Sequence, residues 1–250
     1  MKQSISASFK SFFRNFPYIL LLLLLISVPI NLMQACIVDV HLAESDVLNM
    51  TEDVSGALSK YLIYMFLSFL LTSVLNLLYI GVMLLRKCDY DDAPVDFRTI
   101  FEKSLTLLPK VFVTQILSGI LVGIGLMFFV LPGIILYYVF YMVPFAVVYT
   151  EEWGRKGLHV ASLYPRKNGR KVVGILLFDL AYRFILVMGT SVLLEMAPFV
   201  GRLQTVFSVG VYCFQDLLLC LSFMILGGWA LAMPIDWGQG ENKDDTQESV

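Results

Sequence analysis

Four ionisable residues lie within long apolar stretches of this sequence, where a charge is costly unless it faces a protein interior or a wet cavity. Asp179, Arg183 and Glu195 fall in one stretch and Asp216 in the next. Asp179 and Arg183 are four residues apart, so on a helix they share one face and can form an ion pair. By helical rise, Arg183 and Asp216 both fall near mid-membrane depth. We therefore predict an intramembrane polar site of Asp179, Arg183 and Asp216 that joins two helices.

Two interpretations of this polar site remain open. In the first, the charges form a buried ion pair that fixes the register of two helices and has no further role. In the second, the three side chains bind an anionic head group or relay protons. The residues and their spacing are compatible with both.

The elements that must position this site are apolar segments long enough to cross a bilayer. Of the 250 residues, 58% are hydrophobic and 15% charged, whereas soluble domains have about 45–50% apolar and about 25% charged residues. We predict an all-α, polytopic transmembrane helical bundle of about six spans, formed by residues 1–236. The predicted spans are residues 16–38, 61–85, 109–130, 132–150, 172–195 and 207–233. The acidic residues 237–250 lack apolar periodicity, which predicts a disordered tail.

One apolar tract, residues 111–149, is too long for a single span. As one helix it would measure roughly 60 Å, twice the thickness of the hydrocarbon core. Proline suits the first turn of a new helix and glycine suits a tight turn, so we predict a hairpin turn at Pro132 and Gly133. On the span before this turn, Gly119 and Gly123 predict a face for close helix packing, either within the chain, which we favour, or between two copies.

The basic residues predict the orientation of the chain in the membrane. With the N-terminus inside, 15 of the 18 lysines and arginines fall in cytoplasmic segments. Because these residues resist translocation, the pattern predicts that both termini lie in the cytoplasm. Four of these basic residues directly precede the fifth span and could contact anionic lipids. They are Arg166, Lys167, Arg170 and Lys171.

The cytoplasmic segments before the first and third spans share a design that predicts an internal repeat. Each has apolar residues at helical spacing and leads into a span at a proline, Pro17 or Pro109. Asp96 is the predicted N-cap of the second of these segments. The apolar stripe of the first consists of Ile5, Phe9, Phe12 and Phe16. Residues 157–164 predict a third copy, which gives three units of an interfacial helix and a transmembrane hairpin.

Other chemistry has little support in the sequence. Cys36, Cys88, Cys213 and Cys220 form no CxxC pair, and the two histidines fall in loops on opposite sides of the predicted membrane. We expect no metal site and no cofactor. The sequence has no nucleophile elbow, phosphate-binding loop or zinc-protease motif, so we expect no enzymatic activity. We also expect no nucleic-acid partner.

The residues 130–136, together with Pro144, Phe145 and Glu151, resemble a motif of bacterial six-helix membrane proteins. These are the YciC-like proteins and the membrane domain of some glycerophosphoryl diester phosphodiesterases. Residues 157–163 resemble the loop that follows in that group. The resemblance covers about residues 95–190 and implies a multi-pass protein of the bacterial cytoplasmic membrane. It does not imply phosphodiesterase activity, since the catalytic domain of those enzymes is a separate soluble barrel.

Two functional hypotheses follow. The first is a non-enzymatic integral membrane protein that acts through lipid or partner-protein contacts in membrane or envelope homeostasis, and it predicts a closed, dry bundle. The second is a small secondary transporter or permease subunit with its polar site at Asp179, Arg183 and Asp216, and it requires a polar cavity that reaches the bilayer midplane.

Overall fold

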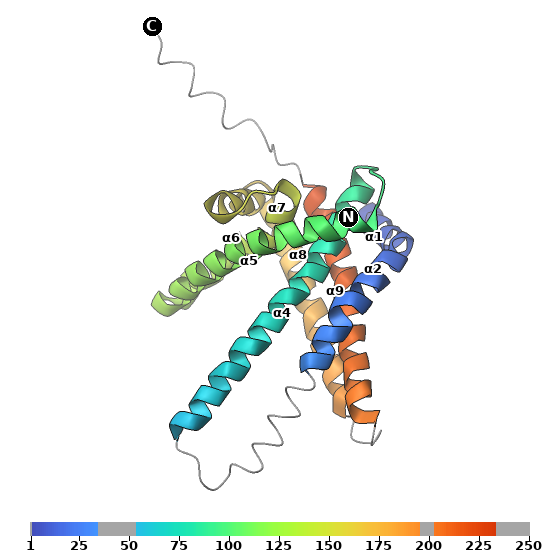
Figure 1. Cartoon of the computed structure of the whole chain (residues 1–250). Helices are drawn as coiled ribbons and strands as arrows, with labels where there is room; N and C mark the ends of the chain where they lie inside the picture. The colour runs from blue at the N-terminus through green and yellow to red at the C-terminus, as the bar shows by residue number, and fades with distance from the viewer. Residues whose placement is uncertain (1, 35–53, 196–202, 234–250) are drawn as a thin grey trace.

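The computed structural model describes residues 2–34, 54–195 and 203–233, and these form an all-helical protein (Figure 1). Within the described residues, five helices are long and apolar enough to cross a membrane. They are Phe16–Gln34, Phe97–Phe128, Val130–Thr150, Gly154–Glu195 and Gln204–Leu231. The predicted class, a multi-pass α-helical membrane protein, is confirmed. The predicted acidic tail at residues 237–250 lies outside the described residues.

The N-terminal region consists of three consecutive helical segments. Helix α1 (Lys2–Arg14) ends at Asn15, and α2 (Phe16–Leu22) starts with the predicted proline in its first turn. The π-helical segment η1 (Leu23–Ser27) follows, and the helix then continues to Gln34. Such single wide turns occur frequently at functional sites.

The predicted apolar stripe of α1 only partly faces the protein. Phe12 is buried, but so are Ser8, Ser11 and Asn15, while Phe9 is exposed. The face of α1 that packs on the bundle therefore carries small polar side chains, and its phenylalanines point mainly outward. Asn15 Nδ2 donates a hydrogen bond of 2.7 Å to Asp89, and Ser11 and Arg14 also contact this carboxylate. These contacts attach α1 to the end of α4.

Helix α4 (Val54–Tyr90) contains the predicted second span, residues 61–85. It is 37 residues long, which corresponds to about 55 Å at 1.5 Å per residue and exceeds the thickness of the hydrocarbon core. It lies outside the five candidates above, so the total of six spans stays a prediction.

Helix α5 (Phe97–Phe128) begins at the predicted N-cap, since the Asp96 carboxylate accepts a hydrogen bond of 3.2 Å from the Thr99 backbone N–H. Pro109, the predicted start of the third span, lies inside α5, which runs through this proline without a break. The amphipathic segment and the third span are therefore one helix. Breaks at Asn15 and Asn168 do separate such a segment from a span elsewhere, so the predicted repeat is only partly realised.

The chain reverses between α5 and α6 (Val130–Phe140) at Phe129, the single extended residue between them. The predicted turn residues Pro132 and Gly133 instead lie in the first turns of α6. Gly133 permits close packing of the hairpin, since a Cβ there would lie 2.4 Å from Leu126 and 2.8 Å from its backbone nitrogen. Gly125 faces Gly133 in the same way.

The Gly119 and Gly123 face does not pack within the chain as predicted. Among the described residues, nothing lies within 4 Å of a Cβ built at either position. The close contact of this helix uses Gly125 instead, two residues nearer the hairpin than Gly123. The spacing of small residues identified a close contact on the correct helix but on the wrong face.

The remaining helices complete the bundle around α9. Helix α7 (Val143–Thr150) ends at Glu151 in the left-handed region (φ 64°), and α8 (Gly154–Glu195) bends at Asn168. Helix α9 (Gln204–Leu231) packs against α1, α4 and α8, and its last turns are buried. Figure 1 shows α4 and the α5–α6 hairpin diverging from the part of the bundle that contains α2, α8 and α9.

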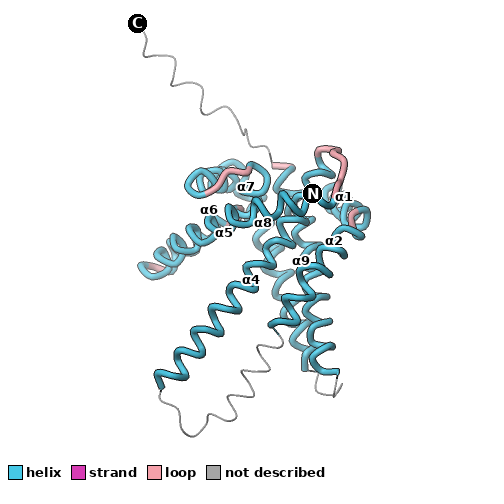
Figure 2. Tube along the Cα trace, viewed as in Figure 1, coloured by secondary structure: helices cyan, strands magenta, loops and turns pink. Residues whose placement is uncertain are grey.

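The short connections gather at one end of the molecule. Figure 2 shows the α4–α5 and α7–α8 connections at the end that also holds α1, while the α5–α6 turn lies far from it. Lys103 Nζ and Glu151 Oε1 are 2.5 Å apart and connect α5 with the end of α7 at this location. The hydrogen bond from Lys103 lowers the pKa of the Glu151 carboxyl.

Candidate functional site

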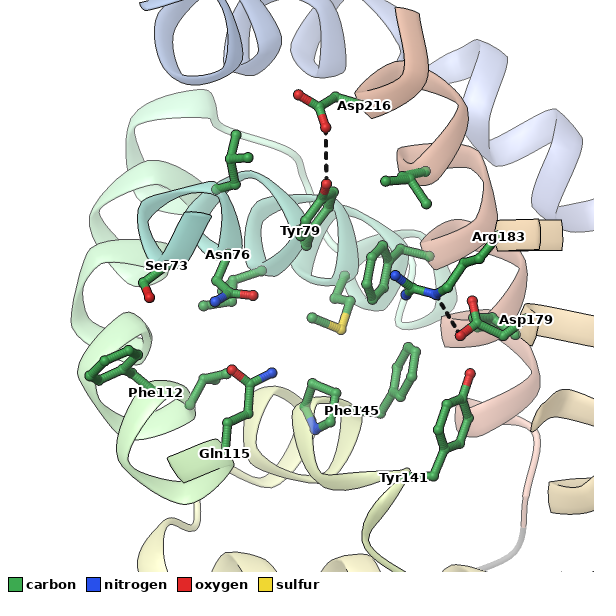
Figure 3. A pocket seen from close by; sticks show the side chains of 18 of the residues that line it. Ser73, Asn76, Tyr79, Phe112, Gln115, Tyr141, Phe145, Asp179, Arg183 and Asp216 are labelled. Carbon is green, nitrogen blue, oxygen red and sulfur yellow. Dashed lines mark hydrogen bonds and ion pairs between the residues drawn. The ribbon is translucent and has the colours of Figure 1, made fainter. Parts of the chain in front are cut away.

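A cavity of about 620 Å³ lies between α4, α5, α7, α8 and α9, and it is lined by all three residues of the predicted polar site (Figure 3). The lining also includes amide side chains and aromatic rings. Asn76 comes from α4, Gln115 from α5 and Gln215 from α9, while Tyr141 precedes α7. The first hypothesis predicts a closed bundle, whereas the structure contains this cavity.

Asp179 and Arg183 form the ion pair that their spacing predicts. Arg183 Nε donates to Asp179 Oδ2 at 2.8 Å, and both residues lie on α8. The Asp179 side chain is 4% exposed, and Ser222 Oγ lies 3.5 Å from its other oxygen. Tyr141 points its hydroxyl toward this carboxylate (Figure 3). Asp179 is thus a buried acceptor that fixes one edge of the guanidinium.

The rest of the Arg183 guanidinium extends toward the cavity (Figure 3). Its side chain is 44% exposed, in contrast to its buried partner. The central carbon lies 5.7 Å from the centroid of the Phe223 ring, a cation–π distance. Among the described residues, Arg183 has no hydrogen-bond partner besides Asp179. Its two terminal nitrogens can therefore donate to a molecule in the cavity.

Asp216 has different partners from those predicted. Its carboxylate accepts hydrogen bonds from Ser27 Oγ at 2.6 Å, Asn31 Nδ2 at 2.9 Å and the Tyr79 hydroxyl at 3.1 Å. The predicted triad is corrected here. All three residues line one cavity, but Arg183 pairs with Asp179 alone, and Asp216 belongs to a second cluster in which its described partners are uncharged donors.

The π-helical segment contributes to this second cluster. Ser27 is the last residue of η1, and Asn31 follows one turn later on the same helix. Asn31 Nδ2 also donates to Ser27 Oγ at 2.9 Å, so the two side chains are held together beside Asp216. The wide turn thereby places two hydrogen-bond donors from the first span against a carboxylate of α9.

An aromatic stack connects the two polar clusters. The Tyr79 ring stacks on Phe223 with centroids 4.6 Å apart, and Phe223 also faces Arg183. The Tyr79 hydroxyl therefore contacts Asp216, and the Tyr79 ring contacts Phe223, which in turn contacts Arg183. The sequence does not single out Tyr79 or Phe223, because aromatic residues are common in apolar segments and the spacing of these two contains no further signal.

The remaining walls of the cavity are apolar. Aliphatic surface comes from Ile80 and Met83 on α4, Val111 on α5, and Leu219 and Leu226 on α9. A volume of about 620 Å³ lies within the range of about 300–1,000 Å³ that is typical of small-molecule sites. The arrangement can therefore enclose an elongated apolar group whose anionic end meets Arg183.

The other residues singled out from the sequence lie away from this cavity. Arg166, Lys167, Arg170 and Lys171 are exposed and flank the bend of α8. The last of them precedes Arg183 by 12 residues, or about 18 Å along a helix. Glu195 is exposed at the end of α8. Within the described part of the chain, no group of three or more His, Cys, Asp or Glu residues could hold a metal ion.

Comparisons with known proteins give one match. A family model described as "Uncharacterised protein family (UPF0259)" matches residues 1–212. No curated protein and no solved structure matches the chain. The kinship with YciC-like proteins and phosphodiesterase membrane domains therefore stays an expectation.

Proposed function

The chain belongs to the uncharacterised protein family UPF0259, and from the geometry of its cavity we propose that it is a non-enzymatic membrane protein that binds an anionic amphiphile. The ligand class is a molecule with one anionic end and one acyl chain, or a lipid that inserts one chain. The proposal depends on one observation, the half-exposed guanidinium of Arg183 facing a cavity with largely apolar walls.

Electrostatics support an anion as the ligand. Asp179 engages only one edge of the guanidinium, through Nε. The planar fork of arginine matches a carboxylate or phosphate through two parallel hydrogen bonds. Charge interactions are stronger in a low-dielectric cavity than in water. An anion that reaches the terminal nitrogens of Arg183 would therefore gain both hydrogen bonds and Coulomb attraction.

The cluster around the Asp216 carboxylate supports a ligand with only one anionic end. A second anionic group at that side of the cavity would meet the Asp216 carboxylate, whose described partners are three neutral donors. Two negative charges within one cavity repel each other. The aliphatic lining suits a chain instead, at about 25 cal/mol for each Å² of apolar surface removed from water.

The test is a binding titration in a sugar-based detergent with oleate and, as its uncharged counterpart, oleyl alcohol. We expect saturable binding of oleate to the wild type and at least tenfold weaker binding to Arg183→Gln. Arg98→Gln is the matched control, since Arg98 is an exposed arginine that pairs with Glu102 on α5. Equal binding of oleate and the alcohol, or unchanged binding to Arg183→Gln, would contradict the proposal.

A second variant separates binding from folding. Ile116 lines the cavity and is also 41% exposed, so Ile116→Trp can be tolerated while it occupies cavity volume. We expect this variant to fold as the wild type does and to bind oleate more weakly. Two results together would refute a cavity site. Ile116→Trp would bind oleate with wild-type affinity, and Arg183→Gln would fold and still bind oleate.

Transport is the second candidate function. Asp216, which we predict to lie at membrane depth, accepts a hydrogen bond from Ser27, the last residue of the π-helical segment, and both polar clusters line one cavity. A proton-coupled transporter would need such a carboxylate and access from both sides. In proteoliposomes, oleate accumulation driven by a pH gradient and lost in Asp216→Asn would favour transport over simple binding.

We also propose that this multi-pass protein lies in the bacterial cytoplasmic membrane with both termini inside. The end that holds α1, the α4–α5 connection and the α7–α8 connection is the one where most described basic residues lie. Arg166, Lys167, Arg170 and Lys171 would then face anionic lipids of the inner leaflet, at about 1 kcal/mol for each basic residue near the surface. A membrane protein partner at this surface is an alternative to lipid contact.

A further inference from the structure

Two amide side chains line the cavity at the end away from Arg183. Asn76 lies on α4 and Gln115 on α5. Figure 3 shows the two amide groups pointing toward one another, while Arg183 lies at the opposite end of the cavity. The ring of Tyr79, one turn after Asn76, stacks on Phe223, which faces Arg183. The aromatic stack therefore separates an uncharged polar region of the cavity from the guanidinium.

Both amide groups are available to a molecule in the cavity. Within the described part of the chain, neither amide side chain has a hydrogen-bond partner. Each offers two N–H donors and a carbonyl oxygen with two lone pairs. The amide of Asn31 differs, since it donates to both Ser27 and Asp216. Asn76 and Gln115 are half-buried, and no hydrogen bond between helices occupies their amides.

The lining around the two amides is apolar. Leu75 and Ile80 come from α4, and Val111 and Ile116 from α5. A hydrocarbon chain in this region would separate the amides from water, and unpaired polar groups in apolar surroundings cost free energy. Sites that hydrogen-bond a ligand hydroxyl discriminate strongly against an analogue that lacks it. A plain hydrocarbon chain is therefore a poor occupant of this region.

We propose that Asn76 and Gln115 form a subsite that binds a hydroxyl group on the chain of the anionic amphiphile. A hydroxyl donates one hydrogen bond and accepts two, so a single oxygen can pair with the carbonyl of one amide and the NH₂ of the other. The inference rests on the proposed function, because Arg183 holds the anionic end and thereby sets which part of the chain reaches the amides. The ligand class is thus an anionic amphiphile with one hydroxyl along its chain.

The experiment titrates the full chain, in a sugar-based detergent, with stearate and with monohydroxystearates whose hydroxyl positions run along the chain. We expect at least one isomer to bind the wild type at least about tenfold more tightly than stearate does. Asn76→Leu and Gln115→Leu should each lose this preference while they bind stearate as well as the wild type does, or better. The ratio of the two Kd values is compared between proteins, which cancels the partition of each ligand into micelles.

Gln204→Leu is the matched control, since Gln204 is an exposed amide on α9 that does not line the cavity. It should keep the wild-type preference. If one leucine variant does not fold, the other decides. Saturable stearate binding with no preferred isomer, or a preference that persists in the folded leucine variants, would overturn the subsite and leave the proposed function intact. Absence of saturable binding of stearate and of every isomer would contradict both.

Discussion

The two members of the Asp179–Arg183 pair should respond very differently to neutralisation. The Asp179 side chain is 4% exposed, whereas that of Arg183 is 44% exposed and rests on Phe223. Arg183→Gln leaves a buried carboxylate whose remaining described neighbours are the neutral hydroxyls of Ser222, at 3.5 Å, and Tyr141. Asp179→Asn leaves a cation that still reaches the cavity. Arg183→Gln, which removes the exposed partner, should therefore lower the free energy of unfolding more than Asp179→Asn, which removes the buried one.

The magnitudes follow from the environment of the charge that remains. Removal of one partner of a buried ion pair costs about 3–5 kcal/mol, and we expect Arg183→Gln to fall in this range. For Asp179→Asn we expect about 1–3 kcal/mol, the cost of one hydrogen bond to a charged group. The double variant should cost less than the sum of the two by about 1–3 kcal/mol, because the residues are in direct contact.

The assay is the free energy of unfolding in mixed micelles for the wild type, both single variants and the double variant. Retained helical content of the folded states, measured by circular dichroism, is the control. A larger loss for Asp179→Asn than for Arg183→Gln would refute the assignment of the buried and exposed partners. Strict additivity would show that the two side chains do not interact.

Three further predictions concern other parts of the molecule. Gly133→Ala should destabilise the α5–α6 hairpin by about 1–3 kcal/mol through overpacking, whereas Gly123→Ala, with nothing within 4 Å, should be neutral by the same unfolding assay. The lowered pKa of Glu151 means that its ion pair contributes stability above about pH 4.3 and loses it as the pH falls through the folded pKa. Because this pair is half-exposed, the difference between the wild type and Glu151→Gln should stay below about 1 kcal/mol at pH 7 and disappear on acidification. Burial raises the pKa of the Cys88 thiol, so at pH 7 an impermeant maleimide should label it slowly and only from the inside. Labelling of Cys88 from the outside would contradict the proposed topology.

The sequence was sufficient to predict the fold class and several helix ends. Apolar length identified five of the predicted spans as candidate membrane helices, and Asp96 marked the start of α5 because an N-cap carboxylate has a local role. Pro109 does not mark a helix end, since α5 continues through this proline. The sequence does not reveal the chain reversal at Phe129. This residue is extended, a backbone conformation that any residue type can adopt.

The polar site was predictable only where it depends on local spacing. Asp179 and Arg183 pair because they are one turn apart on the same helix. The partners of Asp216 come from distant segments, with Ser27 reached through a π-helical turn that the sequence does not reveal.

The central claim is that an anionic amphiphile occupies the cavity beside Arg183. Its most direct test is mass spectrometry of molecules that co-purify with the wild type, with Asp179→Asn/Arg183→Gln and with Arg98→Gln from native lipid nanodiscs. The double variant keeps a neutral hydrogen-bonding pair, which limits the loss of stability. We expect a specific anionic lipid or fatty acid with the wild type and Arg98→Gln, and its loss from the double variant. Equal retention by all three folded proteins, or no specific molecule in any of them, would contradict the account.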